Sequence, residues 1–135
     1  MFDKLLELHI NSYVPVSGFP VSACVVTKDG TEYYGVNVED ASTRAGTCAE
    51  RNAIFAAITD GCKPGDFKEI NVMVSSGKVG TPCFVCRQMI SEMFDENALV
   101  RCHSIYGDCD EYKVRELCPH PFGEEDLEWN VALLV

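Results

Sequence analysis

The sequence predicts an α/β fold, with three layers (α/β/α) around a mixed five-stranded sheet. The chain has 135 residues, a length typical of one domain. Hydrophobic residues make up 47% of it, which is enough for a globular core. Segments rich in β-forming residues alternate with helical segments, and this alternation is typical of helices packed on a sheet. We therefore expect residues 1–135 to form a single domain.

The first forty residues predict a helix followed by a β-hairpin. Residues 2–10 carry apolar or aromatic side chains at helical spacing. Residues 21–27 and 31–37 are rich in β-branched and aromatic residues, and they flank Asp29-Gly30, a dipeptide typical of tight hairpin turns. We expect an amphipathic opening helix and then two antiparallel strands.

Two further helices are expected on either side of a buried strand. Residues 47–60 predict a helix with Ala, Ile and Phe on its inner side and Gly61 at its end. Residues 70–75 predict the buried strand. Thr81-Pro82 then opens a helix that runs to about Phe94, with Pro at the favoured first position. Both helix starts should lie at the same edge of the sheet, where α/β folds bind their ligands.

The rest of the chain predicts a second hairpin and a short closing helix. Residues 99–105 and 111–114 are expected as strands, joined by a tight turn at 107–110. Residues 124–129 are expected to form the last helix.

Composition excludes several classes of function. The formal net charge is −10 and no cluster of Lys and Arg occurs, so DNA and long RNA are poor substrates and a small neutral ligand is favoured. No apolar run approaches the roughly 20 residues that a membrane span needs. Residues 1–8 lack the basic and apolar regions of a signal peptide. We expect a cytoplasmic protein with no nucleic-acid or membrane partner.

Eight cysteines are unusual for a chain of this length. Disulfides do not fit the expected cytoplasmic setting, so some cysteines should be metal ligands and the rest small buried residues. No functional role is predicted for the five that lack partner spacing, namely Cys24, Cys62, Cys102, Cys109 and Cys118.

Three cysteines have the spacing of a metal site. Cys83 and Cys86 lie three residues apart, so they share one face in the first turn of their expected helix, and Cys48 lies in the first turn of another. The positive ends of the two helix dipoles favour thiolates. Zinc prefers such ligands, and catalytic zinc keeps a fourth position open for water.

Glu50 and the three cysteines together form a motif that is typical of a catalytic zinc site. A Cys, a Glu two residues later and a downstream Pro-Cys-x-x-Cys match the zinc deaminase signature, with Cys in place of the usual His, and the Glu of that signature is the general acid and base. Each motif alone has other interpretations. The Cys-x-x-Cys also fits a redox pair or a structural zinc half-site, and Glu50, three residues after Thr47, also fits a capping box.

With these motifs the chain resembles the small homotetrameric class of cytidine deaminases over nearly its full length. The resemblance implies a cytidine-deaminase-like fold, a Zn²⁺ cofactor, a nucleoside substrate and active sites shared between the subunits of a homotetramer. It rests on Phe19-Pro20-Val21, Gly35-Val36-Asn37-Val38-Glu39, Cys48-Ala49-Glu50-Arg51, Pro82-Cys83-x-x-Cys86-Arg87-Gln88, Glu116-Leu117-x-Pro119 and Phe122-Gly123.

The resemblance also implies a role for each site residue. At the metal, it implies Cys48, Cys83 and Cys86 as zinc ligands, Glu50 as the catalytic residue and Arg51 as charge compensation. For the nucleoside, it implies that Phe19 packs against the base, that the Ala49 backbone N–H binds the base carbonyl, and that Asn37 and Glu39 bind the ribose. Phe122 is implied to close the pocket from a neighbouring subunit. The chain departs from the family at three positions, where Phe84 and Ser22 replace Gly and Thr43 replaces Tyr. These departures bear on substrate range.

The function expected from these residues is zinc-dependent hydrolytic deamination of cytidine and deoxycytidine to uridine and deoxyuridine plus ammonia, as in pyrimidine salvage. One alternative is a deaminase of another aminopyrimidine nucleoside such as blasticidin S, but Glu39 and Arg51 favour the cytidine branch. Another is a non-enzymatic zinc-binding module, which would leave Glu50 and the open zinc position without a use.

Overall fold

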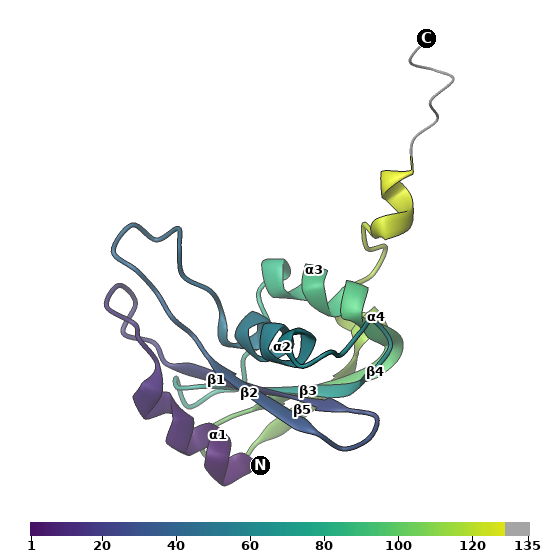
Figure 1. Cartoon of the computed structure of the whole chain (residues 1–135). Helices are drawn as coiled ribbons and strands as arrows, with labels where there is room; N and C mark the ends of the chain where they lie inside the picture. The colour runs from purple at the N-terminus through teal and green to yellow at the C-terminus, as the bar shows by residue number, and fades with distance from the viewer. Residues whose placement is uncertain (129–135) are drawn as a thin grey trace.

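The computed structural model describes residues 1–128 (Figure 1). Position 129 of the expected closing helix lies outside these residues. The elements follow one another as α1 (Phe2–Leu8), η1 (His9–Asn11), β1 (Val21–Thr27), β2 (Glu32–Val36), α2 (Ala49–Thr59), β3 (Phe67–Val74), α3 (Phe84–Met93), β4 (Phe94–His103), β5 (Cys109–Lys113), α4 (Val114–Leu117) and η2 (Glu124–Leu127). None of the helices in residues 1–128 is both long and apolar enough to cross a membrane.

The five strands form one mixed sheet, which confirms the predicted five-stranded mixed sheet, and their order is β2-β1-β3-β4-β5. Strands β3 and β4 are parallel, and every other neighbouring pair is antiparallel. Strand β1 lies between β2 and β3 and pairs with both, so Val25 lies opposite Tyr33 and Ile70. The β3–β4 crossover contains α3, which a parallel connection requires.

The predicted three layers are confirmed, because helices lie on both faces of the sheet. Figure 1 shows α1 below the sheet, and α2 and α3 above it. Side chains alternate between the two faces of a strand. In β1, Ala23 and Val25 pack in the main core with α2, whereas Cys24 and Val26 pack with Leu5 of α1.

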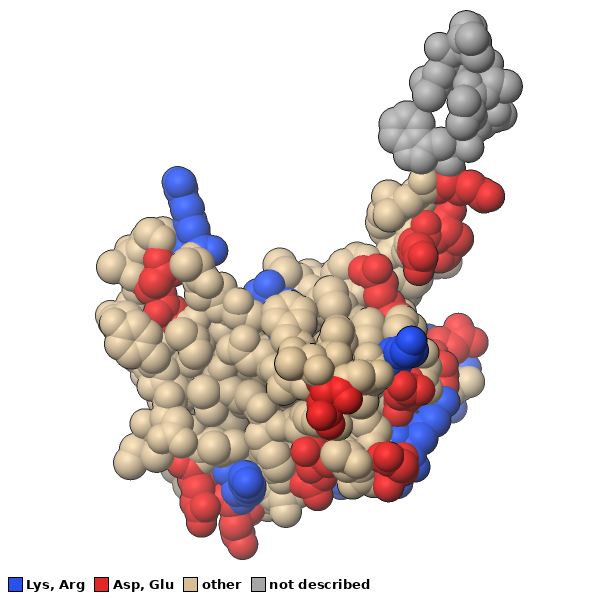
Figure 2. Space-filling view, in the orientation of Figure 1, with Lys and Arg blue, Asp and Glu red and all other residues tan. Residues whose placement is uncertain are grey.

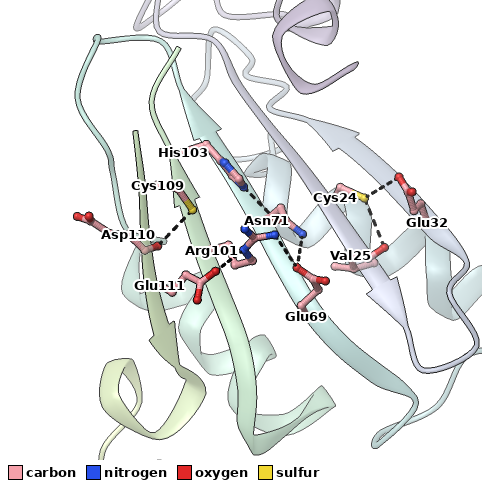
Figure 3. A network of polar contacts seen from close by, with 10 residues as sticks. All are labelled: Cys24, Val25, Glu32, Glu69, Asn71, Arg101, His103, Cys109, Asp110 and Glu111. Atoms are coloured by element: carbon pink, nitrogen blue, oxygen red, sulfur yellow. Dashed lines mark hydrogen bonds and ion pairs between the residues drawn. The ribbon is translucent and has the colours of Figure 1, made fainter. Parts of the chain in front are cut away.

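The α1 face of the sheet carries polar side chains beyond the area that α1 covers (Figure 3). The buried His103 ring lies 3.0 Å from Asn71 Oδ1, through its Nε2. Nearby, Arg101 donates to Glu111 over 2.8 Å and lies 3.7 Å from Glu69. These groups partner one another, which allows polar side chains to lie on a sheet next to a core.

Two of the predicted boundaries at the start of the helices are wrong. Helix α3 begins at Phe84, and Pro82 lies in the loop before its N-cap, so it is not at the first helical position. Helix α2 begins at Ala49, with Cys48 as its N-cap. Both capping cysteines have extended backbone, with ψ of 155° at Cys48 and 164° at Cys83, so the helices begin later than the sequence suggested.

Later elements also differ from the prediction. Strand β4 begins at residue 94, five residues before the predicted start, because the exposed polar residues at 95–97 hide its pattern. The final strand ends at Lys113, and α4 follows it without having been anticipated. The closing element is a 3₁₀ helix over Glu124–Leu127.

Candidate active site

The three predicted metal-ligating cysteines meet at the starts of α2 and α3. Cys48 and Cys83 are the N-cap residues of the two helices, and Cys86 lies in the first turn of α3. Their Sγ atoms all lie within 4.8 Å of one another, and those of Cys48 and Cys83 are 3.8 Å apart. Three sulfurs this close together form a suitable ligand set for one metal ion.

Close packing of α2 on the sheet places this cluster. Gly35 of β2 lies directly under α2, where a Cβ atom would be 2.5 Å from Ala53 N and 2.6 Å from Ala49 O. Only a residue without a side chain allows this approach. The start of α2, with Cys48, is thereby held at the same sheet edge as the start of α3.

The charges around the cluster fit a cation. Hydrogen bonds from Cys86 and from Arg51, whose Nη2 is 3.5 Å from the sulfur, lower the pKa of Cys48 to about 5. The same contact with Cys48 raises the pKa of Cys86. The protein alone therefore favours the thiolate form of Cys48 and the thiol form of Cys86. A divalent cation would stabilise all three thiolates, because metal ligation deprotonates thiols.

Glu50 lies beside the cysteines in a buried position. It is the second residue of α2 and only 5% exposed. Burial, together with a smaller contribution from the charge of the neighbouring Cys48, raises the pKa of its carboxyl group from 4.5 to about 7. A group with this pKa both gives and takes protons near neutrality. The capping-box interpretation is wrong, because Cys48, not Thr47, is the N-cap and no side chain caps the helix.

A pocket of about 250 Å³ opens next to Cys48 and Arg51. The predicted sugar-binding residues Asn37 and Glu39 line it, together with Val16, Val38, Asp40, Thr43, Gly46 and Thr47. Short backbone bridges explain this arrangement, because Val38 pairs with Tyr13 on one side and with Thr47, the neighbour of Cys48, on the other. The structure thus brings four predicted site residues to one pocket.

The side chains of Asn37 and Glu39 already bind the segment before β1. Asn37 donates to Phe19 O over 2.8 Å and accepts from Val21 N–H over 2.9 Å. Glu39 accepts hydrogen bonds from Val16 N–H, Ser17 N–H and the Ser17 hydroxyl. The two residues therefore fix the position of Phe19, whose side chain is 38% exposed.

The structure does not bring Phe122 to this pocket within one chain. Its side chain is 57% exposed, and Gln88 Nε2 donates to its carbonyl oxygen over 2.7 Å on the outer side of α3. It shares a shallow groove there with Phe84, which is 77% exposed and stacks under the Arg87 guanidinium at 4.3 Å. Phe84 therefore lies outside the pocket at Cys48.

The other two departures from the family differ in their surroundings. Thr43 lines the pocket, and its φ of 60° is rare for a β-branched residue. Ser22 is buried and donates to Leu5 O, so it joins β1 to α1 away from the pocket.

Sequence reasoning missed two residues that shape the pocket. Asp40 Oδ1 accepts from the N–H groups of Ala45 and Gly46 and so closes the 40–46 loop. Asp is a common turn residue because its side chain accepts hydrogen bonds from the backbone that follows, as Asp40 also does from Ser42 N–H. Ser17 is the second. It has no recognisable motif around it, and its role follows only from its hydrogen bond with Glu39, which is distant in the sequence.

Figure 2 shows few Lys and Arg side chains around the upper part of the molecule, and no continuous basic surface on the face in view. The only cation that lines the pocket is Arg51. This agrees with a small neutral ligand, because a nucleic-acid backbone is met by clustered positive charge.

Comparison with known proteins identifies the family of the chain. Residues 1–102 match the family model of the cytidine and deoxycytidylate deaminase zinc-binding region. A cytidine deaminase from Sporosarcina psychrophila is 38% identical over 118 residues, which cover 87% of this chain and 85% of the relative. One from Halalkalibacterium halodurans is 34% identical over 94% of this chain and 95% of its own length.

Solved structures show the same fold. The crystal structure of cytidine deaminase from Burkholderia pseudomallei superposes with a TM-score of 0.84 and is 34% identical, covering 90% of this chain and 95% of that one. The family model, the relatives and the fold therefore agree, and this chain belongs to the cytidine and deoxycytidylate deaminase family.

Proposed function

We propose that the chain is a zinc-dependent cytidine deaminase, which converts cytidine and deoxycytidine to uridine and deoxyuridine with release of ammonia. The observation that carries the proposal is the buried Glu50 carboxyl beside a cluster of three cysteine sulfurs, one of which, that of Cys48, lines a pocket with polar groups suited to a sugar. The names of the curated relatives support the same reaction.

Cys48, Cys83 and Cys86 would hold the metal, and we propose that it is Zn²⁺. The family model describes a zinc-binding region, and three sulfur ligands suit this ion. When bound, zinc would act as a Lewis acid and would lower the pKa of a water molecule bound to it towards ~7. Arg51 offsets part of the negative charge of the thiolates through its contact with Cys48.

Glu50 moves the protons of the reaction. Replacing the C4 amino group requires a proton to leave the attacking water, one to reach ring N3 and one to reach the departing amine. One carboxyl group can serve all of these steps because it is buried at the start of α2, beside the cysteines, where it can accept a proton and return it. Burial also keeps it out of bulk water, where its protons would exchange with solvent.

The other predicted residues hold the nucleoside. Asn37 and Glu39 bind the sugar hydroxyls, Phe19 packs against the base, and the Ala49 N–H, free at a helix start, binds the base carbonyl. Phe122 closes the pocket of a neighbouring subunit. We further propose that residues 1–135 form one catalytic domain, that the enzyme is a cytoplasmic homotetramer, and that it acts in pyrimidine salvage.

An ammonia-release assay with the zinc-loaded protein tests the proposal. Cytidine and deoxycytidine should release ammonia, whereas free cytosine and single-stranded DNA should not, because the Asn37 and Glu39 contacts need a free sugar. Turnover of cytosine with a higher kcat/KM than cytidine would contradict the proposal. Turnover of blasticidin S alone would support the alternative deaminase, and no turnover of any substrate would leave only a zinc-binding module.

A further inference from the structure

Ser17 contacts both sides of the proposed nucleoside site. Its hydroxyl donates a hydrogen bond to Glu39 Oε2 over 2.6 Å, and its oxygen accepts one from Phe19 N–H over 3.1 Å. Glu39 is the proposed sugar contact and Phe19 the proposed base contact. One small side chain therefore joins the two groups that meet opposite ends of the substrate.

The hydrogen bonds of Glu39 leave little of its carboxylate free. Oε1 accepts from Val16 N–H at 3.2 Å and from Ser17 N–H at 3.0 Å, and Oε2 accepts from the Ser17 hydroxyl. A carboxylate has about four acceptor positions. Three are filled, and the remaining one is on Oε2, the oxygen that Ser17 holds.

The backbone around Ser17 is held on both sides. Gly18 has a φ of 64°, and its N–H donates to Val14 O over 2.9 Å, which closes a tight turn. At the base of this turn, Tyr13 N–H donates to Asn37 O, and Glu39 N–H donates to Tyr13 O. The turn therefore moves together with Glu39, and the direction of the Ser17 hydroxyl is fixed before any ligand binds.

We propose that Ser17 is a positioning residue for the nucleoside sugar. It orients Glu39 so that the one free acceptor position meets one sugar hydroxyl, and it couples this contact to Phe19. The ionised state of Glu39 agrees with this role, because the Ser17 hydroxyl lowers the pKa of the carboxyl group. The inference rests on the proposed function, and it assigns Ser17 no part in the proton transfers.

The test compares Ser17→Ala with the wild-type full-length, zinc-loaded protein. For cytidine, the variant should have a KM about tenfold higher, the effect of one lost hydrogen bond to a charged group, with kcat within about twofold. For 2′,3′-dideoxycytidine, which lacks the 2′ and 3′ hydroxyls that we assign to Glu39 and keeps only the 5′ hydroxyl, kcat/KM should stay within about twofold of wild type. A purely structural role would change both substrates alike.

Two further variants complete the design. Ser17→Thr keeps the hydroxyl, so its KM for cytidine should be close to the wild-type value. Thr59→Ala removes an exposed hydroxyl that donates to Phe55 O on α2, and it should leave both substrates unchanged. Zinc content and melting temperature are measured for every variant, so that a folding defect is recognised.

The outcomes separate this inference from the proposed function. If Ser17→Ala loses kcat/KM equally for both substrates, or loses none for cytidine, the role of Ser17 is overturned. Cytidine turnover by the wild type would still uphold the proposed function. A fall in kcat with unchanged KM also overturns the role of Ser17. If the wild-type protein deaminates no nucleoside, the proposed function fails, and the inference fails with it.

Discussion

The sulfurs of Cys48 and Cys83 lie 3.8 Å apart although the two residues begin different helices, 35 positions apart in the chain. Neither helix contains the whole cluster. The sheet brings the two helix starts together, since α2 follows the β1–β2 hairpin and α3 crosses from β3 to β4. The affinity for the metal should therefore depend on how α2 and α3 pack on the sheet.

Replacing one of these cysteines should remove the metal. We expect one zinc per wild-type chain, and at least about 100-fold weaker binding in Cys83→Ala, because two sulfurs remain where three converge. Cys109→Ala is the matched control, since this exposed cysteine lies outside the cluster. Metal analysis after dialysis against a chelator measures the difference. Full zinc occupancy and wild-type activity in Cys83→Ala would refute the ligand assignment.

Glu50→Gln should keep zinc and fold but lose turnover by several orders of magnitude. The amide has the size of the carboxyl group and cannot carry protons, and loss of general acid–base catalysis alone costs about 10²–10⁴-fold. Glu7→Gln makes the same exchange on the exposed side of α1 and should leave kcat unchanged. Single-turnover kinetics with cytidine measures the chemical step. Near-normal turnover in Glu50→Gln would assign Glu50 a structural role.

The pKa of Glu50 also predicts how the metal-free protein responds to pH. The folded protein binds this proton with a pKa of about 7 and the unfolded chain with the ordinary 4.5, so the folded state holds more protons between these values. The Glu50 contribution to stability is therefore present below pH 4.5 and is lost as pH rises to 7. The loss should approach about 3 kcal/mol.

Urea unfolding of metal-free wild type and Glu50→Gln isolates this contribution, because Gln is neutral at every pH. The two proteins should have similar free energies of unfolding near pH 4.5. The variant should be the more stable by about 3 kcal/mol above pH 7. A difference that does not change with pH would show that Glu50 ionises normally in the folded protein.

The order of the five strands and of helices α1, α2 and α3 along the chain, and the residue types of the cluster, could be predicted from the sequence. Alternating strands and helices are local patterns, and Cys83 and Cys86 share a helix turn, so local rules suffice for them. The exact helix starts could not be predicted in this way. Cys48 and Cys83 serve as N-caps in place of the usual Ser, Thr, Asp or Asn, so the start signals at Thr47 and Pro82 placed both helix starts two residues too early.

The contacts of the nucleoside pocket could not be predicted from local sequence patterns. Ser17 and Glu39 meet across 22 positions, and only the pairing of Tyr13 with Val38 brings them together. The resemblance to a family supplied Asn37 and Glu39, but it gave no sign that their side chains are already bonded to the backbone at 16–21. Hydrogen bonds between distant segments need the three-dimensional structure.

Gly35→Ala should damage the metal site from a distance. Its new Cβ would meet backbone atoms of Ala49 and Ala53 at about 2.5 Å, and backbone cannot move aside as a side chain does. Such overpacking costs about 1–3 kcal/mol, and it should shift the start of α2 with Cys48. We expect a lower melting temperature and weaker zinc binding.

Gly30→Ala is the control for Gly35→Ala. Gly30 has a φ of 90° in the hairpin turn, and nothing lies within 4 Å of its Cβ position, so substitution strains only the local backbone. It should cost about 1–2 kcal/mol and leave zinc affinity unchanged. Equal zinc affinity in the two variants would show that the approach of α2 to β2 does not hold Cys48 in place.

The last prediction concerns how Phe122 reaches an active site. Its ring is 57% exposed and does not line the pocket at Cys48 in its own chain, although an exposed aromatic side chain gains from burial. A closed symmetric assembly would cover it and exclude water from the base. We expect Phe122→Ala to lower activity at least about tenfold and to keep zinc, because the chain's own cysteines are untouched.

Mixing two impaired variants decides whether Phe122 acts across a subunit boundary. Phe122→Ala and Glu50→Gln are dissociated together and reassembled, with subunit exchange followed by mass spectrometry. If Phe122 serves a neighbour, some sites combine the intact Glu50 of one variant with the intact Phe122 of the other, and activity should rise well above that of either parent. If Phe122 serves its own chain, every site keeps one defect. Complete exchange without recovery of activity would therefore reject shared sites even in a tetramer.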